Sequence, residues 1–221
     1  EDGTTLRESV DQAIPFMVDG LFYELGVHFP ELTLLQADDL PPLEARVLIN
    51  DVPEIQIEVR LDSIVVNEEV DALAKLGIPA VGEVNPASGA PMAWIRKNRV
   101  AELEQLGLNT WTVPGFLILT LSAVLRRKAA DFLGIDDAMA LVGLVKLAFP
   151  CLVAETVPNT VSPFVLTDVL RRLLAEGVSI RDLRRILMVL ADRGRVEHDP
   201  LMLTEYVRAG LQRQICYQLS R

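Results

Sequence analysis

The sequence holds little of the material from which catalytic and metal sites are made. It has two histidines, His28 and His198, and two cysteines, Cys151 and Cys216, among 221 residues. The cysteines form no CxxC pair, so we expect two buried thiols in a reducing compartment, with no positive sign of a disulfide. Glu197-His198-Asp199 comes nearest to a metal-binding stretch, but consecutive residues at a helix start do not converge on one ion. The sequence therefore predicts no metal ion.

Motifs for nucleotide binding and hydrolysis are missing too. There is no Walker loop, no GxGxxG after a strand and no nucleophile elbow. Acidic pairs occur at Asp38-Asp39, Glu68-Glu69 and Asp136-Asp137, in predicted loops or helix starts, where solvation and helix dipoles already account for them. General acid–base catalysis needs a pair held in a pocket, which a sequence does not show. We expect a protein that binds no cofactor and is not an enzyme.

Long hydrophobic runs are absent, although 50% of the residues are hydrophobic. Residues 116–125 come closest to the ~18 apolar residues that cross a bilayer, and they run into Arg126-Arg127-Lys128. The first residues, Glu1 and Asp2, are acidic, unlike the start of a signal peptide. The sequence predicts neither a membrane-spanning helix nor a signal peptide, and its length predicts roughly one or two domains.

Basic residues are scarce in the first part of the chain. Residues 1–90 hold 18 acidic and 4 basic side chains, whereas residues 91–221 hold 13 acidic and 17 basic ones, for a net charge of −10. This net charge argues against nucleic acid and anionic membranes as main partners. An acidic front and a basic back can meet head to tail between copies, or they can reflect unrelated surface composition.

Both strands and helices are predicted before residue 113. Ile55, Ile57 and Val59 alternate with polar residues, and turn residues 50–53 (NDVP) precede them, which predicts a hairpin with one buried face. The predicted strands are 32–35, 45–49, 55–61 and 64–66. The predicted helices are 6–25, with Pro15 at a kink or at the true start, 69–76 and 97–106, the last two ended by Gly77 and Gly107.

Only helices are predicted from residue 113 onward. They cover 113–133, 138–149, 163–176, 179–190 and about 200–215, and the best domain boundary is near Leu133. Ser162 and Pro163 suit a helix start, and Gly177 suits a helix stop. Two apolar stripes are predicted to be buried: Leu166, Val169, Leu170, Leu173 and Leu174 in one helix, and Ile180, Leu183, Leu187 and Leu190 in the next.

The helix predicted to open at Ser179 also carries a basic face. Asp182 lies three residues on, as in a capping box. Arg181, Arg184 and Arg185 fall together opposite the apolar stripe, because neighbours at i+3 and i+4 share a face. Such a face is either solvated or a contact for another copy of the chain.

Several motifs occur in an order that resembles the cytoplasmic domain of the type III secretion export-gate family, also called FHIPEP. The resemblance covers nearly the whole chain. The NDVP turn, together with the absence of the flagellar chaperone-binding residues described below, places it nearer the injectisome branch than the flagellar one. The motifs are Glu24-Leu25-Gly26 with Pro30, Asn50-Asp51-Val52-Pro53, Pro86 to Gly89 with Trp94-Ile95, Leu152-Val153-Ala154-Glu155 with Pro158, Leu173 to Leu187, and Arg208, Leu211, Arg213 and Ile215 as RxxLxRxI.

The resemblance implies an α+β fold in three parts. These are a small mixed α/β subdomain (1–63 with 113–132), an inserted α/β subdomain (64–112) and an all-helical subdomain (133–221). It also implies a membrane-embedded helical bundle before Glu1 and a fourth subdomain after Arg221. The full-length protein is then expected in the bacterial inner membrane, with this part facing the cytoplasm.

The implied function is a docking platform, a nonameric ring that receives export cargo and controls export order. The implied partners are other copies of the chain, a gatekeeper protein, chaperone–substrate complexes, and export switch and stalk proteins, with no nucleic acid. Two alternatives stay open from the residues alone. One is a small-molecule-sensing domain that uses the sheet at 55–61, and the other is a hydrolytic domain with a carboxylate site between subdomains.

The resemblance also points to site residues. Flagellar members carry DPxFG and THL motifs around a chaperone-binding depression, and the matching positions here are Asn85, Ser88 and Leu119. The charge and the aromatic anchor are both absent, which argues against recognition of flagellar chaperones. We expect partner docking at Asn85, Ser88 and Leu119, supported from beneath by Trp94, and a subunit contact at Arg181, Arg184 and Arg185.

Overall fold

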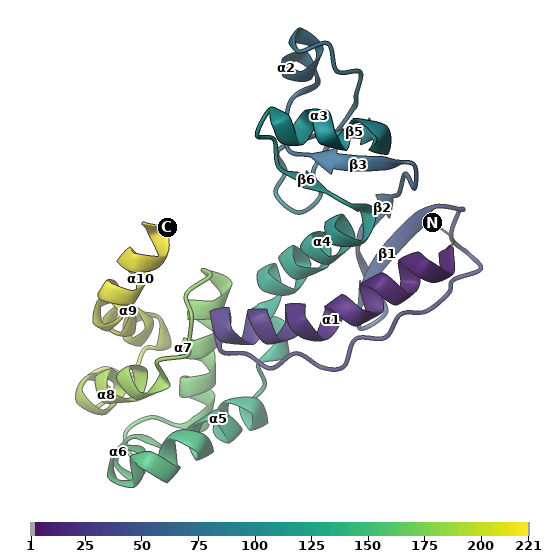
Figure 1. The fold of residues 1–221 in the computed structure, drawn as a ribbon. Helices are drawn as coiled ribbons and strands as arrows, with labels where there is room; N and C mark the ends of the chain where they lie inside the picture. The colour runs from purple at the N-terminus through teal and green to yellow at the C-terminus, as the bar shows by residue number, and fades with distance from the viewer. Residues whose placement is uncertain (1–2, 221) are drawn as a thin grey trace. The chain divides into compact units, whose positions relative to one another are not determined.

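A computed structural model describes residues 3–220, which form two compact units (Figure 1). Unit 1 comprises the residues up to Met17 and Glu31–Leu125, and unit 2 comprises Val18–Pro30 and the residues from Arg126 on. About 54% of the chain is helix and 14% is strand, so the predicted α+β class with a helical C-terminal part is confirmed. The finer division at 1–63 with 113–132, 64–112 and 133–221 stays a prediction.

A two-stranded hairpin begins the β structure of unit 1. It pairs β1 (Glu44–Ile49) with β2 (Val52–Glu58), and a register shift lies between Val47 and Leu48. Asn50 and Asp51 have φ angles of 50° and 64°, the left-handed backbone that a tight hairpin turn needs. The predicted NDVP turn is therefore confirmed.

A four-stranded antiparallel sheet of order β4-β5-β3-β6 follows. One face shares a core with the hairpin and with helix α4, and the other face is covered by small helices. The first core holds Ile57, Val59, Val65, Met92, Trp94, Val113 and Phe116, and the second holds Ile64, Val66, Leu73, Ile78, Ala93, Ile95 and Leu103. This alternation along β3 and β5 is the period of two expected of a strand. The elements are β3 (Ser63–Val66), α2 (Val70–Lys75), β4 (Val81–Val84), β5 (Pro91–Arg96), η1 (Lys97–Arg99), α3 (Val100–Gln105), β6 (Thr110–Trp111) and α4 (Val113–Arg127).

Unit 2 is helical and includes the end of α1 (Gly3–Leu25). All of the residues predicted for its two apolar stripes are buried. Ser162 accepts a hydrogen bond from the Val165 backbone N–H at 3.2 Å, and Gly177 has φ 73°, so the predicted start and stop of α7 are confirmed. The elements are η2 (Ala129–Phe132), α5 (Ile135–Ala148), α6 (Pro150–Thr156), α7 (Pro163–Ala175), α8 (Leu183–Arg193), α9 (Pro200–Gly210) and α10 (Gln212–Leu219).

The predicted start of the following helix was wrong. Helix α8 begins at Leu183, because the Asp182 carboxylate accepts the Arg185 backbone N–H at 3.1 Å and so caps the helix. Ser179 instead accepts the Arg181 backbone N–H at 3.4 Å, within the turn before the helix. Arg181 therefore lies outside α8 and does not share a helical face with Arg184.

Two other predictions also failed. Residues 32–35 form no strand, and the Leu34 carbonyl accepts a hydrogen bond from the Arg7 guanidinium at 3.0 Å instead of pairing with a neighbouring strand. Cys151 and Cys216 are free and exposed, not buried. Each lies on a helix of unit 2 at a position that faces away from its core, which periodicity around a single cysteine does not reveal.

We expect Leu187→Ala to lower the free energy of unfolding by about 2–5 kcal/mol, because the side chain is 0% exposed and its removal leaves a cavity. Urea melts followed by circular dichroism measure this loss. Met188→Ala is the matched control, since Met188 lies on the same helix and is partly exposed. A loss below about 1 kcal/mol for Leu187→Ala would show that this stripe is not core.

Candidate docking and subunit-contact sites

The turn between β4 and β5 is organised around a buried asparagine. The Asn85 side chain accepts the Ala87 backbone N–H at 2.9 Å and donates to the Asn67 side chain at 2.9 Å. The Asn85 carbonyl accepts the Gly89 backbone N–H at 2.8 Å, and Gly89 takes the left-handed φ of 73°. Ser88 is exposed at the tip of this turn. Asn85 therefore shapes the turn from within, and Ser88 is the member that faces solvent.

Trp94 joins three elements of unit 1. Its ring lies edge-on to Phe116 of α4, with ring centres 5.4 Å apart. Its indole N–H donates to Glu83 of β4 at 3.0 Å, and Glu83 accepts from Arg60 at 2.9 Å. Trp94 is buried, and its support of the docking residues from beneath stays a prediction.

Leu119 is the exposed apolar member of the predicted docking set. It lies on α4 three residues after the buried Phe116, and 45% of it is exposed. Residues three apart lie on neighbouring positions of a helix surface, so Leu119 lies next to Phe116 on the surface of α4. That Ser88 and Leu119 line one depression stays a prediction.

The three predicted interface arginines have different surroundings. Arg181 donates to the Tyr23 carbonyl at 2.5 Å and its guanidinium lies 5.4 Å from the centre of the Tyr23 ring. Arg185 donates to the Gly210 carbonyl at 3.3 Å. Arg184 stacks on Phe149, with 4.4 Å between its guanidinium and the ring centre. Arg181 and Arg185 thus serve the fold of unit 2, whereas Arg184 lies beside an aromatic surface.

Sequence reasoning missed three exposed apolar side chains at the end of α5. Leu144 and Leu147 lie on one face of α5, three residues apart, and Leu147 is 84% exposed. Phe149, at the end of the same helix, is exposed as well. The signal was present in the run from Ala138 to Phe149, which is apolar on more sides than a helix needs to cover one core.

The end of α1 is held to unit 2 by polar contacts. Glu24 accepts two hydrogen bonds from Arg126, at 2.7 and 2.8 Å, and this carboxylate raises the pKa of the Arg126 guanidinium. Gly26 has φ 85°, and a Cβ atom there would lie 2.9 Å from the Arg181 backbone nitrogen. The Glu24-Leu25-Gly26 motif is therefore a structural junction.

Glu197-His198-Asp199, the stretch that comes nearest to a metal-binding pattern, forms the start of helix α9. The Glu197 carboxylate accepts the backbone N–H groups of Asp199 and His198, at 2.9 and 2.8 Å. These two hydrogen bonds lower the pKa of Glu197, that of Asp199 having the larger effect. Within residues 3–220, no group of three histidine, cysteine or acidic side chains is arranged to hold a metal ion, and no helix is long and apolar enough to cross a membrane.

Comparison with known proteins identifies the family. The model of the FHIPEP family matches residues 4–221. The chain belongs to the FHIPEP family. The resemblance predicted from the sequence motifs is confirmed, and the relatives of this chain are export-gate proteins of type III secretion systems.

Two curated relatives illustrate the match. Low calcium response locus protein D of Yersinia pestis is 32% identical over 200 residues, which cover 90% of this chain and 28% of that protein. Hypersensitivity response secretion protein HrcV of Ralstonia nicotianae is 36% identical over 196 residues, which cover 89% of this chain and 28% of that protein. The chain thus spans less than a third of the length of these relatives.

Solved structures agree with this fold. The CdsV protein of Chlamydia pneumoniae matches with a TM-score of 0.88 at 30% identity, over 96% of this chain and 60% of that one. The structure of CdsV in complex with CdsO matches with a TM-score of 0.87 at 31% identity, over 95% and 60% of the two chains. CdsV is therefore a solved relative of this chain that has also been solved in complex with CdsO.

We expect Asn85→Ala to destabilise the protein by about 1–3 kcal/mol, because it leaves the Ala87 N–H and the Asn67 side chain without their partner. Ser88→Ala is the control in the same turn. It removes only the exposed hydrogen bond from the Ala90 N–H at 3.3 Å, so it should change stability by less than about 0.5 kcal/mol. Thermal melts measure both. If the two variants were equally stable, the inference that Asn85 shapes the turn would be wrong.

Proposed function

We propose that this chain is a docking domain of a type III secretion export gate, and that it faces the cytoplasm beneath the inner membrane. In the full-length protein it forms part of a nonameric ring that receives a gatekeeper protein and chaperone–substrate complexes, contacts export switch and stalk proteins, and controls export order. Membership of the FHIPEP family supports this proposal, as does the existence of a complex between the relative CdsV and CdsO.

The surface proposed for partner docking lies on unit 1. A rigid turn presents Ser88, and helix α4 presents Leu119 from a firmly packed core. The observation that carries the proposal is the pairing of a half-exposed leucine with the buried Trp94–Phe116 contact beneath the same helix. An apolar side chain on a rigid support suits partner binding, because little conformational freedom is lost when a partner covers it.

The contact proposed between ring subunits lies on unit 2 at Arg184. Its guanidinium stacks on Phe149, which follows the exposed leucines of α5 in the chain. A cation–π pair gains strength when it is removed from water, so a neighbouring subunit that covers this surface would strengthen it. Arg181 and Arg185 stay part of the proposed interface, with their side chains also bound within their own subunit.

The two alternatives from the sequence have less support. On the sheet at 55–61, the side chains of Ile57 and Val59 pack into the shared core of the hairpin, the second sheet and α4, so they are not available to a small ligand. A hydrolytic site needs carboxylates with shifted pKa values in a pocket. Glu197 has a lowered pKa, but this shift comes from the backbone N–H groups of its own turn and not from a pocket.

We expect Leu119→Asp to weaken binding of the cognate gatekeeper or chaperone–substrate complex by roughly tenfold or more, because a charge replaces an apolar contact. Isothermal titration calorimetry on the purified domain measures the affinity, and circular dichroism checks that the domain stays folded. Leu106→Asp is the matched control, since Leu106 is 47% exposed on another helix end of unit 1. Unchanged affinity of folded Leu119→Asp would exclude docking at this surface.

We expect Arg184→Glu to abolish rings of the full-length protein in membranes while the purified domain keeps its melting temperature. The reason is that the charge reversal removes the stacking on Phe149 and opposes any acidic surface of a neighbour. Native gel electrophoresis of detergent extracts measures ring formation. Arg171→Glu, at an exposed arginine of α7, is the control.

Arg181→Glu tests the difference between the three arginines. Because Arg181 binds the Tyr23 carbonyl, its reversal should lower the melting temperature of the domain as well as disturb rings. Normal rings in Arg184→Glu would place Arg184 on a solvated face. Equal melting temperatures for both variants would contradict the distinction drawn from their contacts.

A further inference from the structure

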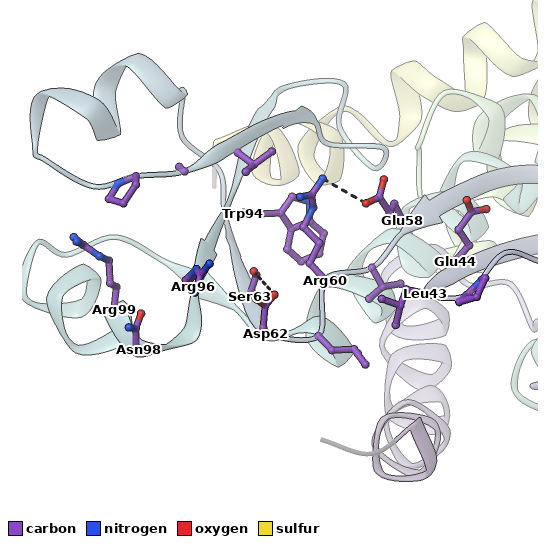
Figure 2. Close-up of a pocket in the computed structure, with 16 residues that line it drawn as sticks. Leu43, Glu44, Glu58, Arg60, Asp62, Ser63, Trp94, Arg96, Asn98 and Arg99 are labelled. Atoms are coloured by element: carbon purple, nitrogen blue, oxygen red, sulfur yellow. Dashed lines mark hydrogen bonds and ion pairs between the residues drawn. The ribbon is translucent and has the colours of Figure 1, made fainter.

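Unit 1 contains a hollow of about 820 Å³ that the family motifs do not include. Figure 2 shows Arg96, Asn98 and Arg99 gathered at one end, and Leu43, Glu44 and Glu58 at the other. Arg60 and Trp94 lie between the two ends. Of the four residues predicted for docking, only Trp94 lines this hollow. The hollow is therefore a separate surface from the one around Leu119.

The acidic side chains of the hollow already have partners. Glu58 lies 3.4 Å from the Arg60 guanidinium, and Glu44 accepts a hydrogen bond from Gln56. Asp62 accepts the Ser63 hydroxyl at 2.9 Å. Each of these three carboxylates therefore already has a partner within the unit.

The arginines at the other end of the hollow, in contrast, have unused hydrogen-bond donors. Arg96 is exposed and, among the described residues, has no ion pair or hydrogen-bonding partner for its side chain. Arg99 uses one guanidinium nitrogen on Glu102 at 3.0 Å, which leaves donors of its fork free. Two arginines with unused donors at the same end of the hollow (Figure 2) favour a carboxylate from outside the unit.

Aliphatic side chains border the same hollow. Leu43 is 53% exposed and Val81 is 50% exposed. Leu43 is also held at φ 64°, a backbone conformation that leucine rarely adopts, and its carbonyl accepts the Val59 N–H at 2.7 Å. An exposed leucine kept in a disfavoured conformation suggests that its side chain is needed at this place, because strain of this kind gathers at binding sites.

We propose that this hollow binds an extended peptide segment of a protein partner, one that carries a carboxylate between aliphatic side chains. The carboxylate pairs with Arg96, assisted by Arg99. The aliphatic side chains rest on Leu43 and Val81. This occupant combines both kinds of free surface in the hollow, whereas a small inorganic anion would use the arginines alone.

The test is a nuclear magnetic resonance titration of the ¹⁵N-labelled domain with the peptide acetyl-Leu-Glu-Leu-Glu-Leu-amide. We expect saturable shifts at the Trp94 indole N–H and at the backbone N–H groups of Val81 and Arg96. The same peptide with glutamine in place of glutamate should bind about tenfold more weakly, because it lacks the charge of the carboxylate. Inorganic phosphate should compete weakly, since it cannot occupy the aliphatic surface.

Three variants complete the design. Arg96→Gln should weaken binding of the glutamate peptide about tenfold and should abolish the difference between the two peptides. Leu43→Asn should weaken both peptides without lowering stability, because asparagine tolerates a positive φ better than leucine. Arg171→Gln, at an exposed arginine of unit 2, and Leu119→Asp should leave peptide binding unchanged.

Two results would overturn the proposal. One is the absence of saturable shifts up to about 10 mM peptide, a concentration above the weakest dissociation constants of specific peptide sites. The other is equal affinity of Arg96→Gln and the unchanged domain for the glutamate peptide. The Leu119→Asp variant separates the two proposals. If the peptide does not bind in the hollow, partner docking at Leu119 is not thereby excluded.

Discussion

The buried indole of Trp94 is the contact on which the arrangement of unit 1 depends. Its ring packs on Phe116 of α4, and its N–H binds Glu83, which in turn binds Arg60. A buried donor without an acceptor would be costly, so the β4 carboxylate is needed to keep the ring in place. The same ring lies beneath the helix that presents Leu119 and also lines the hollow at Arg96. One side chain is therefore shared by the core beneath α4 and by the lining of the hollow.

The helical unit depends on the end of α1 in a comparable way. The Leu25 carbonyl accepts the Ile180 N–H at 2.8 Å, Glu24 binds Arg126, and Arg181 binds the Tyr23 carbonyl. The last carbonyl groups of a helix lack partners within the helix, and here the turn before α8 supplies them. This explains why the Glu24-Leu25-Gly26 motif occurs so far in sequence from the helices that it serves. It also means that part of the basic character of residues 181–185 is used within the unit.

The proposed sites could be predicted only in part from the sequence. The motif around residues 85–89 predicted a turn, and the structure has one. No local sequence pattern predicted that Asn85 is buried and bound to Asn67. The prediction from helical spacing put Arg181 on one face with Arg184, because we assumed that Ser179 caps this helix. Asp182 caps it instead. The hollow at Arg96 was not foreseen, because its lining comes from segments that meet only in the folded sheet.

The sequence by itself determined the α+β class, the apolar stripes of α7 and α8, the NDVP hairpin and the family. These features rest on spacings of two to four residues or on motifs in order, which a linear chain records directly. Only the tertiary structure decided which polar side chains are free. Arg181 reaches a carbonyl 158 residues earlier in the chain, while Arg96 finds no partner at all among the described residues. Hydrogen bonds of this kind join residues that are distant in sequence, so no local pattern encodes them.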